Sequence, residues 1–338
     1  MANATSSAHS VKVVIPDDIV NTFANSPELD RLRAVAAVQI HRERLADEAD
    51  LVKRIGDADI VLSFRPAFTR FPAQVIRACD RLRYICIAGA GVEDADVACA
   101  TSRGVAVGNV ASHGKRAIVE HCVALMFDVA RHVTAQDRAI RSGTWQSRPG
   151  VELGGKTLGI IGLSAIAREL APLAGAIGMH VLSWSRDNDP ARAAAVGAKA
   201  APLEEVLAQA DVLSLHLRLF PELKGFMDAR KFAQMKPGAI LINTARGELI
   251  DDDALVAALT SGKLRGAGLD VFSQQPLPPN HPLLGLPNVV VTPSTAWNTV
   301  EASQRNTRRA IDNVIGFIAG RPNDIVNAAA LGRAQPRS

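Results

Sequence analysis

Short apolar runs alternate with helical patterns along the whole chain. In the first third these runs cover residues 11–15, 60–64, 84–87 and 104–110, and we expect a helix to open at Asp17 and Asp18 after the first run. Strands that alternate with helices are typical of a parallel sheet covered by helices. The pattern therefore predicts a first α/β domain.

The remainder of the chain repeats this alternation. Apolar runs at residues 157–161, 212–217, 239–243, 267–271 and 289–292 predict a second set of strands, and residues 274–282 form a proline-rich loop. One long amphipathic helix is expected over residues 116–141, another helix over 252–261, and a last helix over 300–319. We expect this last helix to return to the first domain. The predicted fold class is α/β, with two Rossmann-like or flavodoxin-like parallel-sheet domains, one of them discontinuous.

Residues 155–186 carry the most specific local signal. Strand, tight turn, helix and strand follow one another there, which is the layout of a βαβ dinucleotide site. Gly162 keeps the glycine of the tight turn, and Ala167 is an accepted variant where the helix packs on the sheet. Ser164 departs from the pattern, because its Cβ narrows the approach of the backbone to a phosphate. The layout nevertheless predicts a pyrophosphate at the helix N-terminus.

Composition narrows the class of protein. The 338 residues suffice for two domains, 48% of them are hydrophobic, and the net charge of +4 arises from scattered Lys and Arg. Scattered charge and few aromatic residues argue against a nucleic-acid interface. No apolar run is long enough to span a bilayer, so we expect a cytoplasmic protein without a membrane partner. Four cysteines without metal-binding spacing are expected as small buried thiols: Cys79, Cys86, Cys99 and Cys122.

Five sequence blocks in a fixed order connect the chain to a known family. They are GKTLGIIGLSAIAREL, DVLSLHLRL, MKPGAILINTARGELIDDDAL, GAGLDVF and NVVVTP. In these blocks the chain resembles the D-isomer-specific 2-hydroxyacid dehydrogenase family over nearly its whole length. The resemblance implies a split catalytic domain (residues 1–108 and 300–338), a central NAD(P)-binding Rossmann domain (109–299) and a homodimer built around the latter.

The family's three catalytic positions are only partly kept. The family uses an Arg in its N-T-x-R-G block, a His acid/base in T-P-H, and a Glu that orients this His. Here Arg246 is retained, whereas Ser294 stands at the His position and Gln275 at the Glu position. Reduction of a ketone needs a cation and a proton donor at the oxygen, and a hydroxyl with an ordinary pKa is a poor substitute for imidazole. The resemblance thus implies a dehydrogenase with an altered acid/base site.

Other residues are considered for two roles near this site: binding the substrate and replacing the missing acid/base group. By resemblance, backbone N–H groups of Ala90 and Gly91 bind the substrate carboxylate, although a simple tight turn is the alternative. Lys115 and Arg116 are interpreted mainly as surface charge. None of the histidines is a good replacement for the missing base, and His113 in the hinge loop is the first to test. His121 on the long helix is expected to serve packing or dimer contact, and His216 a structural or cofactor-edge role. His281 lies in the proline-rich loop, where the family also has counterparts.

The cofactor is expected to be NADP or NAD, with NADP slightly favoured. Ser185 and Arg186 stand where an NAD site has an acidic residue, and a hydroxyl with a guanidinium suits a 2′-phosphate. Asp187, one residue further, leaves NAD open. The expected cofactor contacts are Gly162, Ser164, Ala165, Ile166, Ser185, Arg186, Thr244, Ala245 and Asp270.

Three functions remain open from the sequence. The first is an NAD(P)-dependent oxidoreductase acting on a small anionic 2-hydroxy or 2-keto acid. The second is a catalytically impaired family member that binds a nucleotide or keto acid as a sensor or scaffold. The third is a different reaction in the inherited site.

Overall fold

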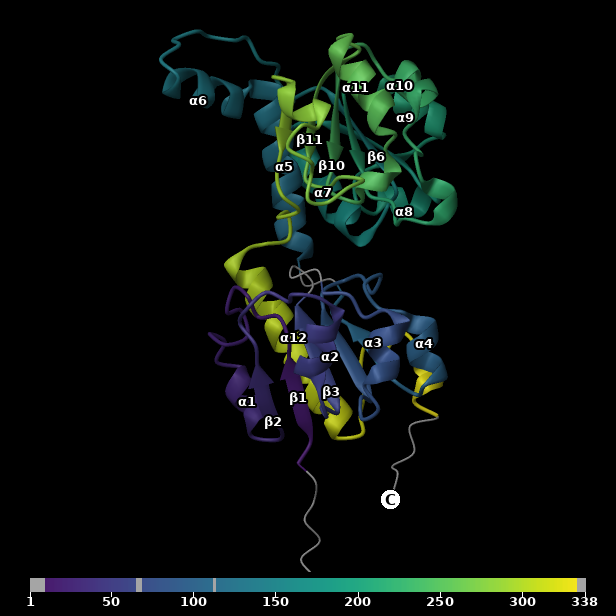
Figure 1. Ribbon diagram of the computed structural model, residues 1–338. Helices are drawn as coiled ribbons and strands as arrows, with labels where there is room; N and C mark the ends of the chain where they lie inside the picture. Colours follow the sequence, from purple (N-terminus) through teal and green to yellow (C-terminus); the bar gives the residue numbers. More distant parts are fainter. Residues whose placement is uncertain (1–9, 65–68, 112–113, 333–338) are drawn as a thin grey trace, which may run out of the picture. The chain divides into compact units, whose positions relative to one another are not determined.

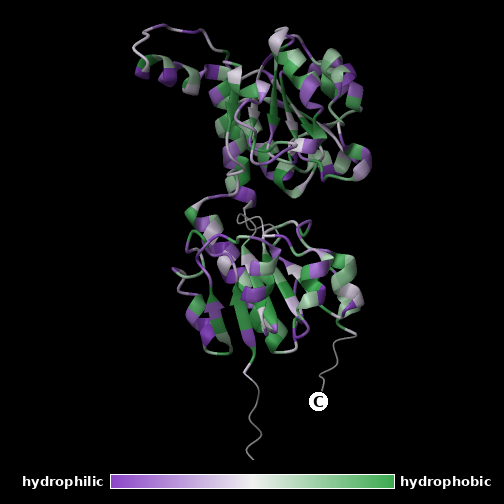
Figure 2. Ribbon diagram, in the orientation of Figure 1, coloured by the Kyte–Doolittle hydropathy of each residue, from purple (hydrophilic) through white to green (hydrophobic). Residues whose placement is uncertain are grey.

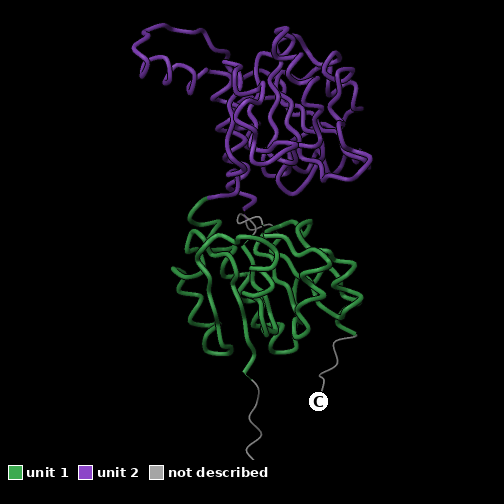
Figure 3. The backbone as a smooth tube through the Cα atoms, viewed as in Figure 1, with its two compact units in different colours: residues 1–113, 299–338 green, residues 114–298 purple. Residues whose placement is uncertain are grey.

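The computed structural model describes residues 10–64, 69–111 and 114–332. The chain divides into two compact units, shown in different colours in Figure 3. Unit 1 combines Met1–His113 with Thr299–Ser338, and unit 2 is Gly114–Asn298. Figure 2 shows that hydrophobic residues concentrate in the central strands of each unit. The two parallel sheets of these units confirm the predicted α/β fold class.

Unit 1 is built on a five-stranded parallel sheet in the order β2-β1-β3-β4-β5. All residues of β3 and β4 are buried, because helices cover both faces of the sheet. The strands are β1 (Lys12–Ile15), β2 (Ala37–Ile40), β3 (Ile60–Phe64), β4 (Tyr84–Ala88) and β5 (Ala106–Asn109). The helices are α1 (Leu29–Arg33), α2 (Glu48–Ile55), α3 (Ala73–Ala78), α4 (Val97–Ser102), α12 (Val300–Ile318) and the 3₁₀ turn η5 (Ala328–Ala330).

Helix α12 packs on the sheet of unit 1, although its residues are far in sequence from the strands of that sheet (Figure 1). The rings of Phe317 and Tyr84 stack with centroids 4.5 Å apart. The side chain of Asn306 donates a hydrogen bond of 3.1 Å to the carbonyl of Ala88, at the end of β4. The last long helix of the chain therefore covers part of the sheet of unit 1.

The helix expected at Asp17 and Asp18 is absent, and this prediction was wrong. The Asp18 carboxylate accepts hydrogen bonds from the backbone N–H groups of Phe23 and Ala24, which bends the segment into turns. Asp17 is buried and accepts a bond from the Ser63 hydroxyl, and burial raises the pKa of this carboxyl. Both carboxylates thus fix a loop, and the first helix starts only at α1.

Unit 2 contains a seven-stranded parallel sheet in the order β12-β11-β10-β9-β6-β7-β8. Its strands are β6 (Thr157–Ile161), β7 (His180–Trp184), β8 (Lys199–Ala200), β9 (Val212–Leu215), β10 (Ala239–Asn243), β11 (Leu264–Leu269) and β12 (Val289–Val291). Its helices are α5 (Lys115–Arg131), α6 (Val133–Arg141), α7 (Ala165–Ala176), α8 (Pro190–Ala194), α9 (Leu203–Gln209), α10 (Ala229–Gln234) and α11 (Asp252–Thr260). Three 3₁₀ turns are η2 (Pro221–Leu223), η3 (Gly247–Leu249) and η4 (Pro282–Gly285).

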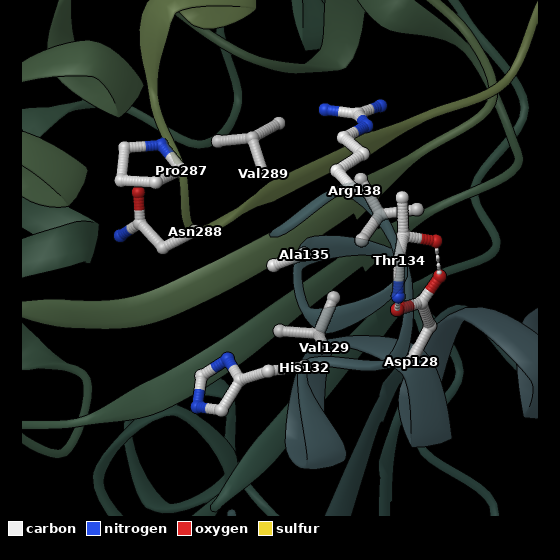
Figure 4. Close-up of a pocket in the computed structure, with 10 residues that line it drawn as sticks. Asp128, Val129, His132, Thr134, Ala135, Arg138, Pro287, Asn288 and Val289 are labelled. Atoms are coloured by element: carbon white, nitrogen blue, oxygen red, sulfur yellow. Dashed lines mark hydrogen bonds between the residues drawn. The ribbon is translucent and has the colours of Figure 1, made fainter. Parts of the chain in front are cut away.

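The long helix expected over residues 116–141 is broken in two, which corrects the sequence interpretation. His132 adopts the left-handed conformation (φ 57°) and ends α5, and the Asp128 carboxylate accepts a bond of 2.8 Å from Thr134 N–H at the start of α6. Figure 4 shows this junction lining a small pocket beside Val289 of β12. The new direction of the chain makes α6 project away from the sheet of unit 2 (Figure 1).

The four cysteines are free and buried, as expected. Among the helices of the described ranges, none is both long and apolar enough to cross a membrane.

Candidate active site

The dinucleotide-type turn follows β6, the strand at which the order of the sheet reverses direction. Gly162 has φ +95°, and a Cβ there would lie 2.9 Å from the carbonyl oxygen of His216, which follows β9. Only glycine meets both demands. The ends of β6 and β9 therefore meet at the topological switch point, where open α/β sheets bind ligands.

Ser164 is the N-cap of α7. Its hydroxyl oxygen accepts a hydrogen bond of 3.3 Å from the Ala167 backbone N–H, and its own backbone is extended (φ −70°, ψ 175°). The position therefore needs no left-handed conformation. Ala165 and Ile166 form the first turn of α7, so their backbone N–H groups lie at the positive end of the helix. This turn fits a pyrophosphate.

A small charged cluster follows β7. The Ser185 hydroxyl donates a hydrogen bond of 2.7 Å to the Asp187 carboxylate, which also pairs with Arg192. The Arg186 guanidinium lies over the Phe220 ring, 5.6 Å from its centroid. Sequence reasoning missed Arg192 and Phe220, because they come from α8 and from the segment before η2. Two guanidinium groups and one carboxylate therefore gather in the segment that follows β7.

The loop after β10 carries Arg246. Asn243 holds this loop with both ends of its amide: its oxygen accepts from Ala245 N–H (3.0 Å) and its nitrogen donates to the Arg246 carbonyl (2.9 Å). A Cβ at Gly247 would lie 1.9 Å from the carbonyl carbon of Phe272, so this loop requires glycine. Thr244 is buried, and its hydroxyl oxygen lies 3.1 Å from the Cys122 sulfur. The backbone that presents Arg246 is thus fixed.

Asp270, directly after β11, anchors the turn that contains Ser294. The Asp270 carboxylate is buried and accepts hydrogen bonds from the Thr292 hydroxyl (2.5 Å), Thr295 N–H (2.8 Å) and Ala296 N–H (2.9 Å). Ser294 has φ 57°, and its N–H donates to the Asp270 carbonyl. Asp270 therefore fixes the backbone of the turn that contains Ser294.

His121 reaches this same turn from α5. Its Nε2 lies 3.0 Å from the Thr292 hydroxyl oxygen and 3.6 Å from a carboxylate oxygen of Asp270. The sequence interpretation gave His121 only packing or dimer contact and missed this arrangement. The available signal was spacing: His121 follows Ile118 by three residues and precedes Leu125 by four, so it shares the sheet-facing side of α5.

Gln275 is not joined to Ser294 by a hydrogen bond in the described parts of the chain. Its side-chain nitrogen donates to the carbonyl of Phe272 at 3.3 Å, inside its own loop. The neutral amide therefore stabilises the loop and supplies no carboxylate to the site.

The other residues singled out in the sequence make local hydrogen bonds or ion pairs. His216 is buried beside the Ser214 hydroxyl (2.9 Å), and burial lowers its pKa to about 4, so the imidazole is neutral. His281 accepts a bond from Leu283 N–H at the start of η4. His113 lies outside the described residues. Lys115 and Arg116 form ion pairs with glutamates, and in unit 1 the Ala90 carbonyl, next to Gly91, accepts a bond of 2.6 Å from Asn109.

In the described ranges, no group of three or more His, Cys, Asp or Glu side chains is placed to hold a metal ion.

Comparisons with known proteins identify the family of this chain. Residues 123–296 match the family described as "D-isomer specific 2-hydroxyacid dehydrogenase, NAD binding domain". The hydroxypyruvate reductase of Blautia hydrogenotrophica is 35% identical over 294 residues, covering 85% of this chain and 90% of that protein. A glyoxylate reductase from Paecilomyes thermophila superposes with a TM-score of 0.83 at 30% identity, over 94% of this chain and 98% of the other. An acyclic imino acid reductase in complex with NADPH and D-Arg superposes with a TM-score of 0.82 at 27% identity, over 94% and 100%. The chain belongs to the D-isomer-specific 2-hydroxyacid dehydrogenase family and is a nicotinamide-dependent oxidoreductase.

Proposed function

We propose that this protein interconverts a small anionic 2-keto acid and its 2-hydroxy acid with NADP(H), at a site whose acid/base group is altered. The observation that carries the proposal is the Arg246 loop, whose backbone Asn243 and Gly247 fix just after β10. In the sequence resemblance, Ser294 stands where the family has its imidazole. The Arg246 guanidinium, which donates a hydrogen bond of 2.8 Å to the Ala245 carbonyl, would stabilise the negative charge that develops on the carbonyl oxygen of the substrate. Unit 1 is then the substrate domain, and Ala90 and Gly91 would bind the substrate carboxylate through backbone N–H groups.

The nicotinamide cofactor would be held by the turn at Gly162 and Ser164 and by the first N–H groups of α7, Ala165 and Ile166. Thr244, Ala245 and Asp270 would line the nicotinamide end. The bound cofactor supplies or accepts the hydride. Gly162 fits this role because any Cβ would fill the turn.

A preference for NADP(H) rests on the cluster after β7. The Asp187 carboxylate is already paired with Arg192 and with the Ser185 hydroxyl, so it is less available to a ribose diol. Arg186, oriented over Phe220, remains on the same edge as a partner for a 2′-phosphate. The neighbouring imino acid reductase was solved with NADPH.

The test begins with the purified protein and no substrate. NADPH and NADH are titrated by nicotinamide fluorescence, and a panel of 2-keto acids that includes hydroxypyruvate, glyoxylate and pyruvate is then offered. Tighter binding of NADPH and turnover of at least one acid support the proposal. Failure to bind either cofactor contradicts it.

Neither Ser294 nor Gln275 has a side chain that ionises near neutral pH, and this favours a second candidate function. In that case the protein binds cofactor or keto acid as a sensor or scaffold without turnover. Two results together would support this alternative: the protein binds cofactor but turns over no acid, and Arg246→Ala leaves cofactor binding unchanged.

We also propose a homodimer that uses α6. No residue of α6 is buried within the chain, Ile140 is 55% exposed and Trp145 beyond the helix is 90% exposed. Exposed apolar side chains on a projecting helix are typical of a contact surface. Light scattering should give twice the chain mass, and the double change Ile140→Glu with Trp145→Ser should reduce it. Val20→Glu, at an exposed valine of unit 1, is the matched control.

A further inference from the structure

Three side chains that contact one another in sequence lie at the Ser294 turn: His121, Thr292 and Asp270. His121 Nε2, the Thr292 hydroxyl and the Asp270 carboxylate follow one another at 3.0 Å and 2.5 Å. They come from α5, from the residue after β12 and from the residue after β11, three elements that pack together. Residues far apart in sequence therefore lie together at the turn that contains Ser294, the position that the resemblance assigns to the acid/base group.

The His121 imidazole is accessible to protons from solvent, because 23% of its side chain is exposed, whereas the Asp270 carboxylate is 3% exposed. A solvent-linked imidazole next to a buried carboxylate changes the net charge of the pair with pH. Imidazole is the side chain that changes charge between about pH 5 and 8. The net charge of the pair therefore differs by one unit between the protonated and the neutral imidazole.

Two carboxylates near α5, Glu120 and Glu169, are paired with cations and do not contact His121. On α5 itself, Glu120 is exposed and bonded to Arg116, and Glu169 of α7 pairs with Lys115. Burial raises the pKa of the neighbouring Cys122 thiol to about 12, so it stays neutral. β12 contributes no charged side chain, and the loop after β10 contributes Arg246. Asp270 is the carboxylate within ion-pair distance of His121 among the described residues.

The two other described histidines near the carboxyl ends of the strands do not contact the Ser294 turn. His216 is buried and neutral beside Ser214. His281 accepts a hydrogen bond at Nδ1 from Leu283 N–H, and its Nε2 lies 4.0 Å from the Asp252 carboxylate, which is not part of that turn.

We propose that His121 is a positioning residue whose protonation sets the charge of the Asp270 turn and thereby the pH dependence of the reaction. This inference rests on the proposed function. Reduction places negative charge on the substrate oxygen as the hydride reaches the carbon, and a proton from solvent completes the alcohol. An unscreened Asp270 carboxylate opposes that charge, whereas a protonated His121 screens it. Reduction is therefore favoured below the ionisation of His121 and declines above it, and oxidation of the hydroxy acid shows the opposite trend.

The test compares the unmodified enzyme, His121→Gln and the control His180→Gln, which changes an exposed imidazole at the start of β7. For the unmodified enzyme and the control, kcat/KM for keto-acid reduction should decline with rising pH through one ionisation and level off at a lower value, because the form with neutral His121 lacks the screening charge. The glutamine keeps a donor toward Thr292 but does not titrate, so His121→Gln should show a flat profile over the same range. At each pH, the NADPH dissociation constant of His121→Gln should stay within twofold of that of the unmodified enzyme. The urea unfolding midpoints of the two proteins should agree within the measurement error.

A second readout needs no turnover. The His121 ring is followed by NMR against pH without cofactor, and the conservative variant Thr292→Val, which removes the hydroxyl between the two groups, should shift its titration midpoint. A midpoint that does not move overturns the inference, as does a His121→Gln enzyme that keeps the pH dependence of the unmodified one. Equal losses in binding, stability and rate at every pH would also overturn it in favour of a purely structural role. Absence of turnover by the unmodified enzyme is a different result: it overturns the proposed function, and this inference with it.

Discussion

The Ser164 hydroxyl oxygen accepts a hydrogen bond from the backbone N–H of Ala167 at 3.3 Å. The serine that departs from the glycine pattern is therefore the cap of α7, which explains its presence without reference to the cofactor. Ser164→Ala should lower the free energy of unfolding by about 1 kcal/mol, and Ser164→Gly by only a few tenths, because glycine is itself a tolerated N-cap. Urea denaturation of the three proteins measures this order. Equal losses in the two variants would show that the cap contributes little.

Cofactor preference is tested at the end of β7. Arg186→Ala should weaken NADPH by about 1.5–3 kcal/mol, the range for a hydrogen bond to a charged group, and NADH by much less. Fluorescence titration of both cofactors gives the two constants. Arg192→Ala is the matched variant: it frees Asp187 and should shift the preference toward NADH. Equal binding of the two cofactors by the unmodified protein would contradict the assignment.

The altered acid/base site can be restored. Ser294 already has a left-handed backbone (φ 57°), a conformation in which histidine is among the better-tolerated side chains, so Ser294→His requires no change of the turn. General acid–base catalysis contributes typically about 10²–10⁴-fold, and Ser294→His with Gln275→Glu should recover part of this. The double variant should exceed Ser294→His alone, because the carboxylate orients the ring. Steady-state rates with one responsive keto acid decide the question, and a fast unmodified enzyme would contradict the impaired-site interpretation.

Buried His216 makes stability depend on pH. Its folded-state pKa is lowered from 6.5 to about 4, so the stabilisation is fully present above pH 6.5 and is lost as the pH falls through 4. The shift corresponds to about 3 kcal/mol at most. His216→Gln should flatten the decline of unfolding free energy between pH 6.5 and 4, measured by urea denaturation, while the exposed His180→Gln should not. A parallel decline in both variants would assign acid sensitivity to other groups.

The sequence was informative where burial is continuous and less so elsewhere. β3, β4 and β10 are buried along their whole length, and such apolar runs are recognised directly. The strands β2 and β8 escaped notice because they lie at sheet edges, are short and are largely exposed.

Side-chain to backbone contacts account for the remaining errors. Asp18 looked like a helix start but bonds to N–H groups five and six residues ahead, and the break at His132 depends on an Asp128 cap that no periodicity reveals. His121 was assigned to packing, because its partners Thr292 and Asp270 lie about 150 to 170 residues away in sequence and meet it only through the order of the sheet.

The last long helix has a consequence for the order in which the protein is made. Tyr84 and Ala88 of β4 receive their partners Phe317 and Asn306 only after residues 300–318 have been synthesised. Unit 2 is continuous in sequence, so its sheet can assemble while the ribosome is still translating. The N-terminal strands, although made first, then wait with one face of their sheet uncovered, and this interval is when the nascent chain is most exposed to aggregation and to chaperones.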